Sequence, residues 1–113
     1  MSLLSRTEEI ILLVIWRLKE NAYGVTIADK LTETTGKKWR LGAIYVPLER
    51  LEKKGYLRST MGNSTNKRGG RRKRLYTITK VGFDALIETR NLEENIWKDI
   101  SVLNLEDGYE AQR

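Results

Sequence analysis

The 113-residue sequence contains no cysteine and no histidine, and its only proline is Pro47. Without cysteine it has no disulfide framework, no thiol nucleophile and no cysteine-based zinc site. Without histidine it lacks the commonest general base and the commonest metal ligand. We therefore predict that the protein is not an enzyme and that it holds neither a metal nor a cofactor.

Long apolar runs are also absent. The longest one, residues 10–16, is far shorter than the ~20 residues that span a bilayer. It follows two glutamates and leads to no small-residue cleavage site, so we expect no signal peptide. These absences predict a cytoplasmic protein that does not enter a membrane.

Acidic residues are scarce in the middle third of the chain. Residues 1–36 hold four Lys/Arg and five Asp/Glu, residues 37–80 hold fourteen and two, and residues 81–113 hold three and eight. The resulting balances of −1, +12 and −5 give the net charge of +6. So uneven a distribution predicts that the middle third contacts a polyanion.

Capping residues and apolar periodicity predict two helices at the start of the chain. Ser5-Arg6-Thr7-Glu8 is typical of a capping box, and an apolar helix is expected to follow through Leu18. A second, shorter helix is expected over about residues 25–34, with Gly36 as its stop. Its expected inner face consists of Val25, Ile27, Ala28 and Leu31.

A third helix is expected over about residues 42–54, where apolar residues recur at helical spacing until Gly55. Its expected inner residues are Leu41, Ile44, Leu48 and Leu51. Proline lacks a backbone donor and clashes with the preceding turn of a helix, so Pro47 predicts an irregular first turn. The opposite face carries small residues first and basic ones later, which suits a helix in a major groove. That face consists of Gly42, Ala43, Val46, Glu49, Arg50 and Lys53.

Two β-like runs, residues 56–61 and 74–79, flank a long basic tip. The tip, residues 62–73, contains five Lys/Arg and three Gly. An ordinary hairpin loop has only ~2–5 residues. Because arginine offers forked donors to phosphate and glycine allows close approach, we predict that the hairpin lies on a nucleic-acid backbone. A solvated loop without a partner is the alternative.

The last third is expected to form one long helix from after Thr79 to about Leu105, followed by a polar tail. Its apolar residues step by 4, 4 and 3, close to a coiled-coil seam. No later element can cover this stripe, so we predict a homodimer; packing of the helix onto its own domain is the alternative. The predicted dimerisation residues are Leu92, Ile96, Trp97, Ile100 and Leu103.

Five short motifs follow one another in the order of the elements of a winged helix-turn-helix. They are Ala22-Tyr23-Gly24, Leu41-Gly42-Ala43-Ile44-Tyr45, Leu48-x-x-Leu51-Glu52-Lys53-Lys54-Gly55-Tyr56-Leu57, Arg68-Gly69-Gly70-Arg71-Arg72-Lys73-Arg74-x-Tyr76 and Thr79-x-x-Gly82. Together they make the chain resemble the short branch of the PadR family of transcriptional regulators, with a single C-terminal helix. The resemblance implies a winged helix-turn-helix, a homodimer through the terminal helices and repression at a roughly palindromic operator. One departure is Val46, which separates the tyrosine from Pro47, whereas many relatives have the proline directly after the tyrosine.

We therefore predict a mainly helical chain with a small β-hairpin, divided into a winged helix-turn-helix DNA-binding domain (1–79), a C-terminal dimerisation helix (80–105) and a polar tail (106–113). The predicted function is a sequence-specific DNA-binding transcriptional regulator, a repressor that binds a palindromic operator in double-stranded DNA as a homodimer. The Tyr45 ring is expected to pack while its hydroxyl reaches a phosphate; a simple core tyrosine is the alternative. The predicted DNA-binding residues are Lys38, Arg40, Gly42, Ala43, Tyr45, Val46, Arg50, Lys67, Arg68, Gly69, Gly70, Arg71, Arg72 and Lys73.

Other functions stay open at this point. A sequence-independent RNA- or ribosome-associated basic protein would share the basic middle third but would need no dimer seam. A protein-interaction module with a winged-helix fold would be expected to lack the basic hairpin. Trp16 and Trp97 are candidates for lining a small-molecule pocket between subunits, but a tryptophan on an apolar face more often fills a core or an interface, and no particular effector is predicted.

Overall fold

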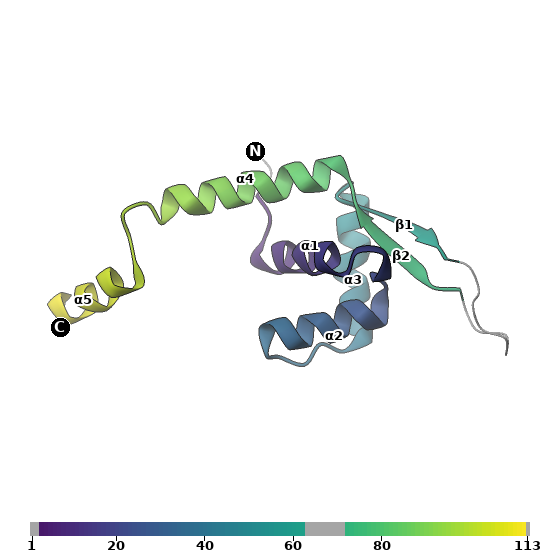
Figure 1. Ribbon diagram of the computed structural model, residues 1–113, viewed down its shortest axis with the longest axis horizontal. Helices are drawn as coiled ribbons and strands as arrows, with labels where there is room; N and C mark the ends of the chain where they lie inside the picture. Colours follow the sequence, from purple (N-terminus) through teal and green to yellow (C-terminus); the bar gives the residue numbers. More distant parts are fainter. Residues whose placement is uncertain (1–2, 63–71, 113) are drawn as a thin grey trace.

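The computed structural model describes residues 3–62 and 72–112, which form five α-helices, a short 3-10 turn and a two-stranded antiparallel hairpin (Figure 1). The elements are α1 (Arg6–Leu18), η1 (Lys19–Asn21), α2 (Gly24–Thr35), α3 (Leu41–Lys53), β1 (Leu57–Met61), β2 (Arg74–Ile78), α4 (Lys80–Ile96) and α5 (Val102–Gln112). This order confirms the predicted mainly helical chain with one small β-hairpin.

The core lies where α1, α2 and α3 meet under the hairpin. The helix α1 packs against α2, β2 and α4, and α3 packs against α2 and β1. The residues with no exposed surface are Ile11, Leu12, Ile27, Leu31, Ile44, Leu48 and Leu51. Two residues predicted to face inward are exposed instead, Val25 by 48% and Leu41 by 40%. Both lie in the first turn of their helices, and Val25 lines a surface cleft.

The predicted capping box at the start of α1 is confirmed. The Ser5 hydroxyl accepts a hydrogen bond from the Glu8 backbone N–H (3.1 Å), and the Ser5 backbone N–H donates to the Glu8 carboxylate (2.9 Å). The same carboxylate pairs with the Lys54 ammonium at 2.6 Å, which ties α1 to the end of α3. Burial acts to raise the pKa of Glu8, but hydrogen bonds from Lys54 and Ser5 outweigh it and hold the pKa below its usual value.

The helix α3 continues through Pro47 without a break. Proline cannot donate to the carbonyl four residues before it, which belongs to the exposed Ala43, so water can solvate that carbonyl. We predicted an irregular first turn. The irregularity is limited to one hydrogen bond between residues three apart, from the Ala43 N–H to the Arg40 carbonyl (3.0 Å). The outward residues of α3 therefore keep regular helical spacing.

The hairpin is fastened to the helical core at its base. Leu57 lies opposite Ile78 and Met61 opposite Arg74, and the side chains of Leu57 and Ile78 are buried. In the middle of β2, the Tyr76 N–H donates to the Ala22 carbonyl at 2.9 Å. This bond joins the hairpin to the segment that precedes α2, so the hairpin and the helix-turn-helix form one unit.

The start of α4 packs closely against the hairpin base. The Thr79 hydroxyl accepts from the Gly82 N–H at 3.0 Å, which confirms Thr79 as the N-cap. A Cβ at Gly82 would overlap the Tyr56 carbonyl oxygen and lie only 2.8 Å from Ile78 Cγ2. The Thr79-x-x-Gly82 motif therefore has a physical reason, because it caps the helix and lets its first turn touch the hairpin backbone.

The C-terminal part consists of two helices, so the predicted single helix to Leu105 is wrong, and residues 106–112 of the predicted tail are helical. The helix α4 ends at Ile96, and Asp99 has a positive φ of 63°. Ser101 and Asn104 then cap a new helix reciprocally, with two hydrogen bonds of 3.1 Å between side chain and backbone. The apolar residues predicted as one seam fall on α4, the connection and α5, so no continuous stripe joins them within one helix.

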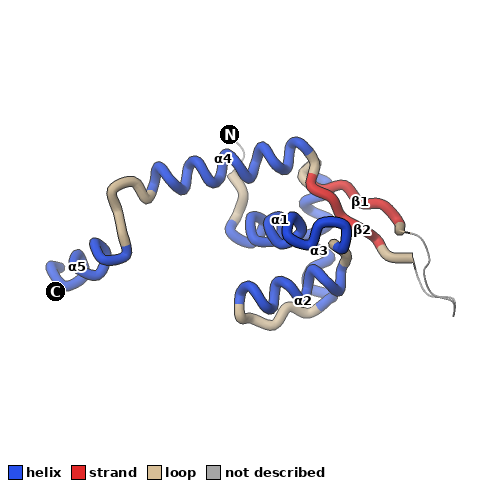
Figure 2. Tube along the Cα trace, in the orientation of Figure 1, coloured by secondary structure: helices blue, strands red, loops and turns tan. Residues whose placement is uncertain are grey.

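The molecule is elongated, with extents of 64 × 29 × 20 Å and a radius of gyration of 17.7 Å. A compact domain of about 100 residues has a radius of gyration of about 13 Å. Figure 2 shows the cause: α4 extends from the hairpin past α1, and α5 lies beyond it at the end of a loop. The C-terminal helix α5 is therefore displaced from the core.

Candidate nucleic-acid interface

The N-terminal half of α3 exposes small side chains. Gly42, Ala43 and Val46 all face solvent, and Val46 is 60% exposed. A Cβ at Gly42 would meet no atom within 4 Å. Another macromolecule can therefore approach the α3 backbone closely along this half of the helix.

Basic residues precede this face in the loop between α2 and α3. Lys37, Lys38 and Arg40 are exposed there. Between them, Trp39 anchors the loop to α2: its backbone N–H donates to the Thr32 hydroxyl and its indole N–H to the Thr35 hydroxyl, both at 3.0 Å. No role was predicted for Trp39 from the sequence, because its two hydrogen bonds depend on Thr32 and Thr35 of the preceding helix.

Further along α3, the predicted Arg50 is exposed, as is Lys53. The Lys53 ammonium lies 3.5 Å from the Glu49 carboxylate one turn before it. Both side chains are more than two-thirds exposed, so this pair contributes little to stability. Positive charge on this part of α3 is partly offset by Glu49.

Tyr45 connects α3 to the start of α2. It is 46% exposed, so it is not the core tyrosine of the alternative prediction. Its hydroxyl oxygen would lie 2.7 Å from a Cβ added at Gly24. Glycine at position 24 therefore makes room for the Tyr45 side chain against the first turn of α2.

A cleft of about 430 Å³ separates α2 and α3 from the hairpin. Its lining contains three cations and no acidic residue. The lining residues are Tyr23, Gly24, Val25, Tyr45, Met61, Arg72, Lys73, Arg74 and Tyr76. A concave surface of this charge suits an anion such as a phosphate group. Burial raises the pKa of the Tyr76 hydroxyl, so this side chain stays neutral beside the cations.

The cations of the hairpin are held in defined positions. The Lys73 ammonium lies over the Tyr23 ring, 4.3 Å from its centroid. Arg72 Nε donates to the Gly62 carbonyl at 3.0 Å, and the Arg74 guanidinium donates to the Ser59 hydroxyl at 2.9 Å. The other predicted hairpin contacts, Lys67, Arg68, Gly69, Gly70 and Arg71, lie outside the described residues.

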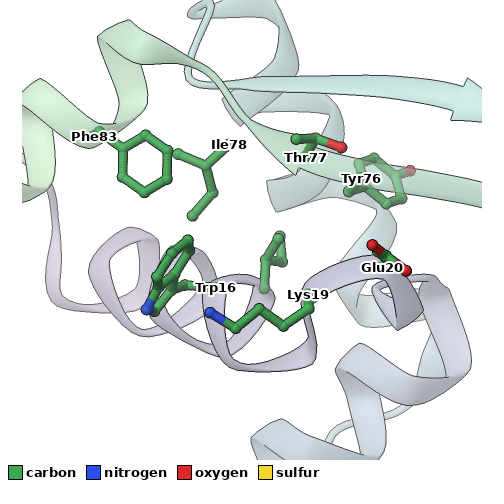
Figure 3. A pocket seen from close by; sticks show the side chains of 8 residues that line it. Trp16, Lys19, Glu20, Tyr76, Thr77, Ile78 and Phe83 are labelled. Carbon is green, nitrogen blue, oxygen red and sulfur yellow. The ribbon is translucent and has the colours of Figure 1, made fainter.

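A second cavity, of about 340 Å³, lies between the end of α1, β2 and the start of α4 (Figure 3). Trp16 meets Phe83 edge to face with ring centroids 5.5 Å apart, and the Lys19 ammonium lies 3.5 Å from the Trp16 ring centroid. Trp97 lines a different groove, between the N-terminal segment and α4. Trp16 thus lines the cavity beside β2, and Trp97 lines the groove beside α4.

A metal site and a membrane-spanning helix are both absent from the part of the chain that the structure describes. Across residues 3–62 and 72–112, no three acidic side chains come together as a metal site. In the same residues, no helix has the length and apolar character that a membrane span requires.

Comparisons with known proteins identify the family that shares this arrangement. Residues 11–88 match the family model described as the transcriptional regulator PadR-like family. A search of curated proteins returns no significant match. Among solved structures, a PadR-like transcriptional regulator from Bacillus cereus is 29% identical, with a TM-score of 0.67 over 88% of this chain and 89% of that one.

Two further structures extend the comparison. A PadR family transcription regulator from Clostridium difficile is 28% identical, with a TM-score of 0.64 over 84% of this chain and 93% of that one. RosR from H. salinarum, at 23% identity, shows the fold alone, with a TM-score of 0.66 over 97% of this chain and 96% of that one. With the family match covering most of its length, the chain belongs to the PadR-like family of DNA-binding transcriptional regulators.

Proposed function

We propose that the protein is a sequence-specific transcriptional repressor that binds a near-palindromic operator in double-stranded DNA as a homodimer. The observation that carries this proposal is the exposed N-terminal half of α3, which lies between two groups of cations. One group is in the loop before α3, and the other lines the cleft beside the hairpin. A helix with cations on both sides fits a major groove, which is bordered by phosphates on both sides.

In this proposal α3 recognises the base sequence. Gly42, Ala43 and Val46 are short, so the helix backbone can approach the base edges, and the methyl groups of alanine or valine can contact a thymine methyl. Arg50 lies about one turn beyond Val46, where a helix leaving the groove meets the phosphate backbone. A wide B-form groove accepts such a helix, whereas the deep and narrow major groove of A-form RNA does not.

The surrounding cations supply affinity that does not depend on sequence. Lys37, Lys38 and Arg40 would contact phosphates on one side of the groove, and Lys73 and Arg74 on the other. Each neutralised phosphate releases counterions, so binding should weaken steeply as salt concentration rises.

The C-terminal helices support the homodimer. Ile96, Trp97, Ile100 and Leu103 are all exposed in a single chain, Leu103 by 70%, and Leu92 is partly buried. A two-fold dimer would place two copies of α3 in successive major grooves, roughly 34–36 Å apart, which requires a near-palindromic operator. A dimer that covers two half-sites would keep other proteins off the same DNA, which supports repression.

Selection of bound duplexes from a random pool tests this function. We expect the selected sequences to converge on an inverted repeat, and the dimer to bind it at least a hundredfold more tightly than a scrambled duplex of the same composition. Equal affinity for both duplexes, together with equal binding to RNA, would instead support a sequence-independent basic protein. Convergence on an unrepeated half-site would contradict the dimer while leaving sequence recognition intact.

A further inference from the structure

The basic middle third of the chain contains only two acidic residues, Glu49 and Glu52. Glu49 lies 3.5 Å from the Lys53 ammonium on the same helix. Glu52 instead accepts a hydrogen bond from the Ser59 hydroxyl on β1, at 2.6 Å. An acid close to a DNA-binding surface repels phosphate groups, so Glu52 weakens DNA binding unless it acts through another residue.

A tight turn brings Ser59 back beside Glu52. Gly55 has a positive φ of 83°, a conformation that glycine adopts easily, and its N–H donates to the Glu52 carbonyl at 3.0 Å. The Tyr56 N–H donates to the Leu51 carbonyl at the same distance. Because these bonds fix the start of β1 against the end of α3, the Glu52 and Ser59 side chains are held within reach of each other.

The Ser59 hydroxyl has a second partner, the Arg74 guanidinium, which donates to it at 2.9 Å. A hydroxyl has one proton to donate, and an ionised carboxylate can only accept. The Ser59 proton therefore points to Glu52, which leaves an oxygen lone pair for Arg74. The contact between the acid on α3 and the cation on β2 passes through this hydroxyl.

Arg74 lies at the end of the hairpin that is farther from the core. It is opposite Met61 in the hairpin and lines the cleft between the hairpin and the helices α2 and α3. Its guanidinium has five N–H donors, so the bond to Ser59 leaves donors for a phosphate. An arginine side chain loses rotamer freedom when it binds, and a bond that already holds it reduces that loss.

We infer that Glu52 and Ser59 are positioning residues, which hold the Arg74 guanidinium in the cleft where it meets a phosphate of the bound DNA. The inference rests on the proposed function, which places Arg74 on a phosphate, and adds how the recognition helix orients a cation of the hairpin. The effect is on affinity and not on sequence preference, because a phosphate contact carries no base information.

A double-mutant cycle of Ser59→Ala and Arg74→Ala tests the inference. The probes are the duplex selected from the random pool and a scrambled duplex of the same composition. We expect Ser59→Ala to weaken binding to both about two- to tenfold, as the loss of one hydrogen bond does, and to lower the slope of log K against log salt. In the Arg74→Ala background, Ser59→Ala should have no further effect.

Two matched variants separate this role from a general effect on the strand. Ser59→Thr keeps the hydroxyl and should bind like the wild type. Thr60→Ala removes a hydroxyl from the exposed neighbouring position, which faces the other side of β1, and should also bind like the wild type. Thermal unfolding confirms that each variant is folded at the temperature of the titration.

Variants of Glu52 separate positioning from simple charge. Removal of an acid near DNA relieves repulsion and by itself strengthens binding. We expect Glu52→Ala to weaken binding instead, because the Ser59 hydroxyl loses the acceptor that directs its proton. Glu52→Gln keeps an amide oxygen as an acceptor and should bind at least as tightly as the wild type.

Three results would overturn the inference: unchanged affinity of Ser59→Ala, equal losses from Ser59→Ala with and without Arg74, or tighter binding by Glu52→Ala. In each case, a wild type that prefers the selected duplex leaves the proposed function standing. A wild type that binds both duplexes equally would contradict the proposed function, while coupling in the cycle on both duplexes would still support the positioning role.

Discussion

The surface around α3 exposes small side chains and cations, whereas the surface of α4 and α5 exposes large apolar side chains and acids. Residues 37–80 carry a charge balance of +12, and residues 81–113 carry −5. Cations on a hydrated surface attract a polyanion over a distance, while clustered apolar side chains favour contact with another protein. In the proposed function, the two ends of the molecule have separate partners, DNA at one and a second copy at the other.

The two ends also differ in how they are held. The helix α3 is fixed by fully buried Ile44, Leu48 and Leu51, and α5 buries nothing. A rigid recognition helix keeps its outward residues in register with DNA, because its inner residues cannot move. By contrast, α5 has no buried residue that fixes its position against the core.

The largest effect should come from breaking the C-terminal surface. Ile96→Asp combined with Ile100→Asp places two charges where the dimer would bury apolar side chains, and we expect monomers and a loss of operator affinity of more than a hundredfold. Sedimentation and gel-shift titration measure the two effects. Asn95→Asp, which adds a charge on a neighbouring face of α4, is the control and should leave the dimer intact. A double variant that remains dimeric would contradict this role of α4 and its connection.

Replacing one glycine in α4 and one in α5 compares how tightly the two helices are packed. Gly82→Ala should lower the free energy of unfolding by about 1–3 kcal/mol, because the added methyl overlaps the Tyr56 carbonyl oxygen and crowds Ile78. Gly108→Ala in α5 meets no atom within 4 Å and should leave the stability of the core unchanged while favouring helix by up to about 1 kcal/mol. Chemical denaturation of both variants provides the measurement. Equal losses would show that α5 is packed as tightly as the start of α4.

Cations at the two ends should contribute unequally to DNA binding. Replacing Lys73 and Arg74 with alanine should weaken all duplexes severalfold and reduce the slope of log K against log salt by about 0.9 for each lost phosphate contact. Arg90→Ala on α4 removes a cation that pairs with Glu94 at 3.2 Å, far from the hairpin, and should leave the slope unchanged. An unchanged slope in the first variant would show that the cleft beside the hairpin does not touch DNA.

The smallest effect concerns the ion pair of Glu8 and Lys54. Because the pKa of Glu8 is lowered in the folded protein, the pair adds stability above the ordinary value of 4.5, and this contribution is lost as the pH falls through the folded value. Glu8→Gln should therefore be less stable than the wild type at pH 7, with the difference shrinking on acidification. Thermal unfolding at pH 7 and pH 3 measures it. A difference that grows in acid would mean that the sign of the pKa shift is wrong.

Local signals in the sequence predicted much of the fold. Ser5 and Thr79 were identified as caps because a side chain that satisfies the first backbone donors of a helix acts within a few residues. Gly36 was identified as a stop, and its φ of 75° is the left-handed conformation that glycine adopts easily. The start of α5 also has a local signal, since Ser101 and Asn104 cap it reciprocally, but the seam spacing predicted one continuous helix there.

Contacts between distant residues could not be predicted in this way. Position 82 requires glycine because the Tyr56 carbonyl occupies the place of a side chain. Position 24 requires glycine because the Tyr45 hydroxyl does the same. The prediction that Val25 and Leu41 face inward was wrong. Helical spacing shows on which face of a helix a residue lies, but not whether a neighbouring helix covers that turn. The predicted DNA contacts likewise depend on a partner, so the sequence and the fold support them without testing them.

The central claim is that α3 recognises the operator sequence, and one substitution tests it most directly. Ala43→Glu brings a negative charge toward the bases without touching the core, since Ala43 is exposed. Ala111→Glu makes the same change on α5 and serves as the control. We expect Ala43→Glu to lower affinity for the selected operator more than tenfold at unchanged thermal stability, while Ala111→Glu binds like the wild type. Footprints and affinities for Ala43→Glu that equal those of the wild type would contradict the account.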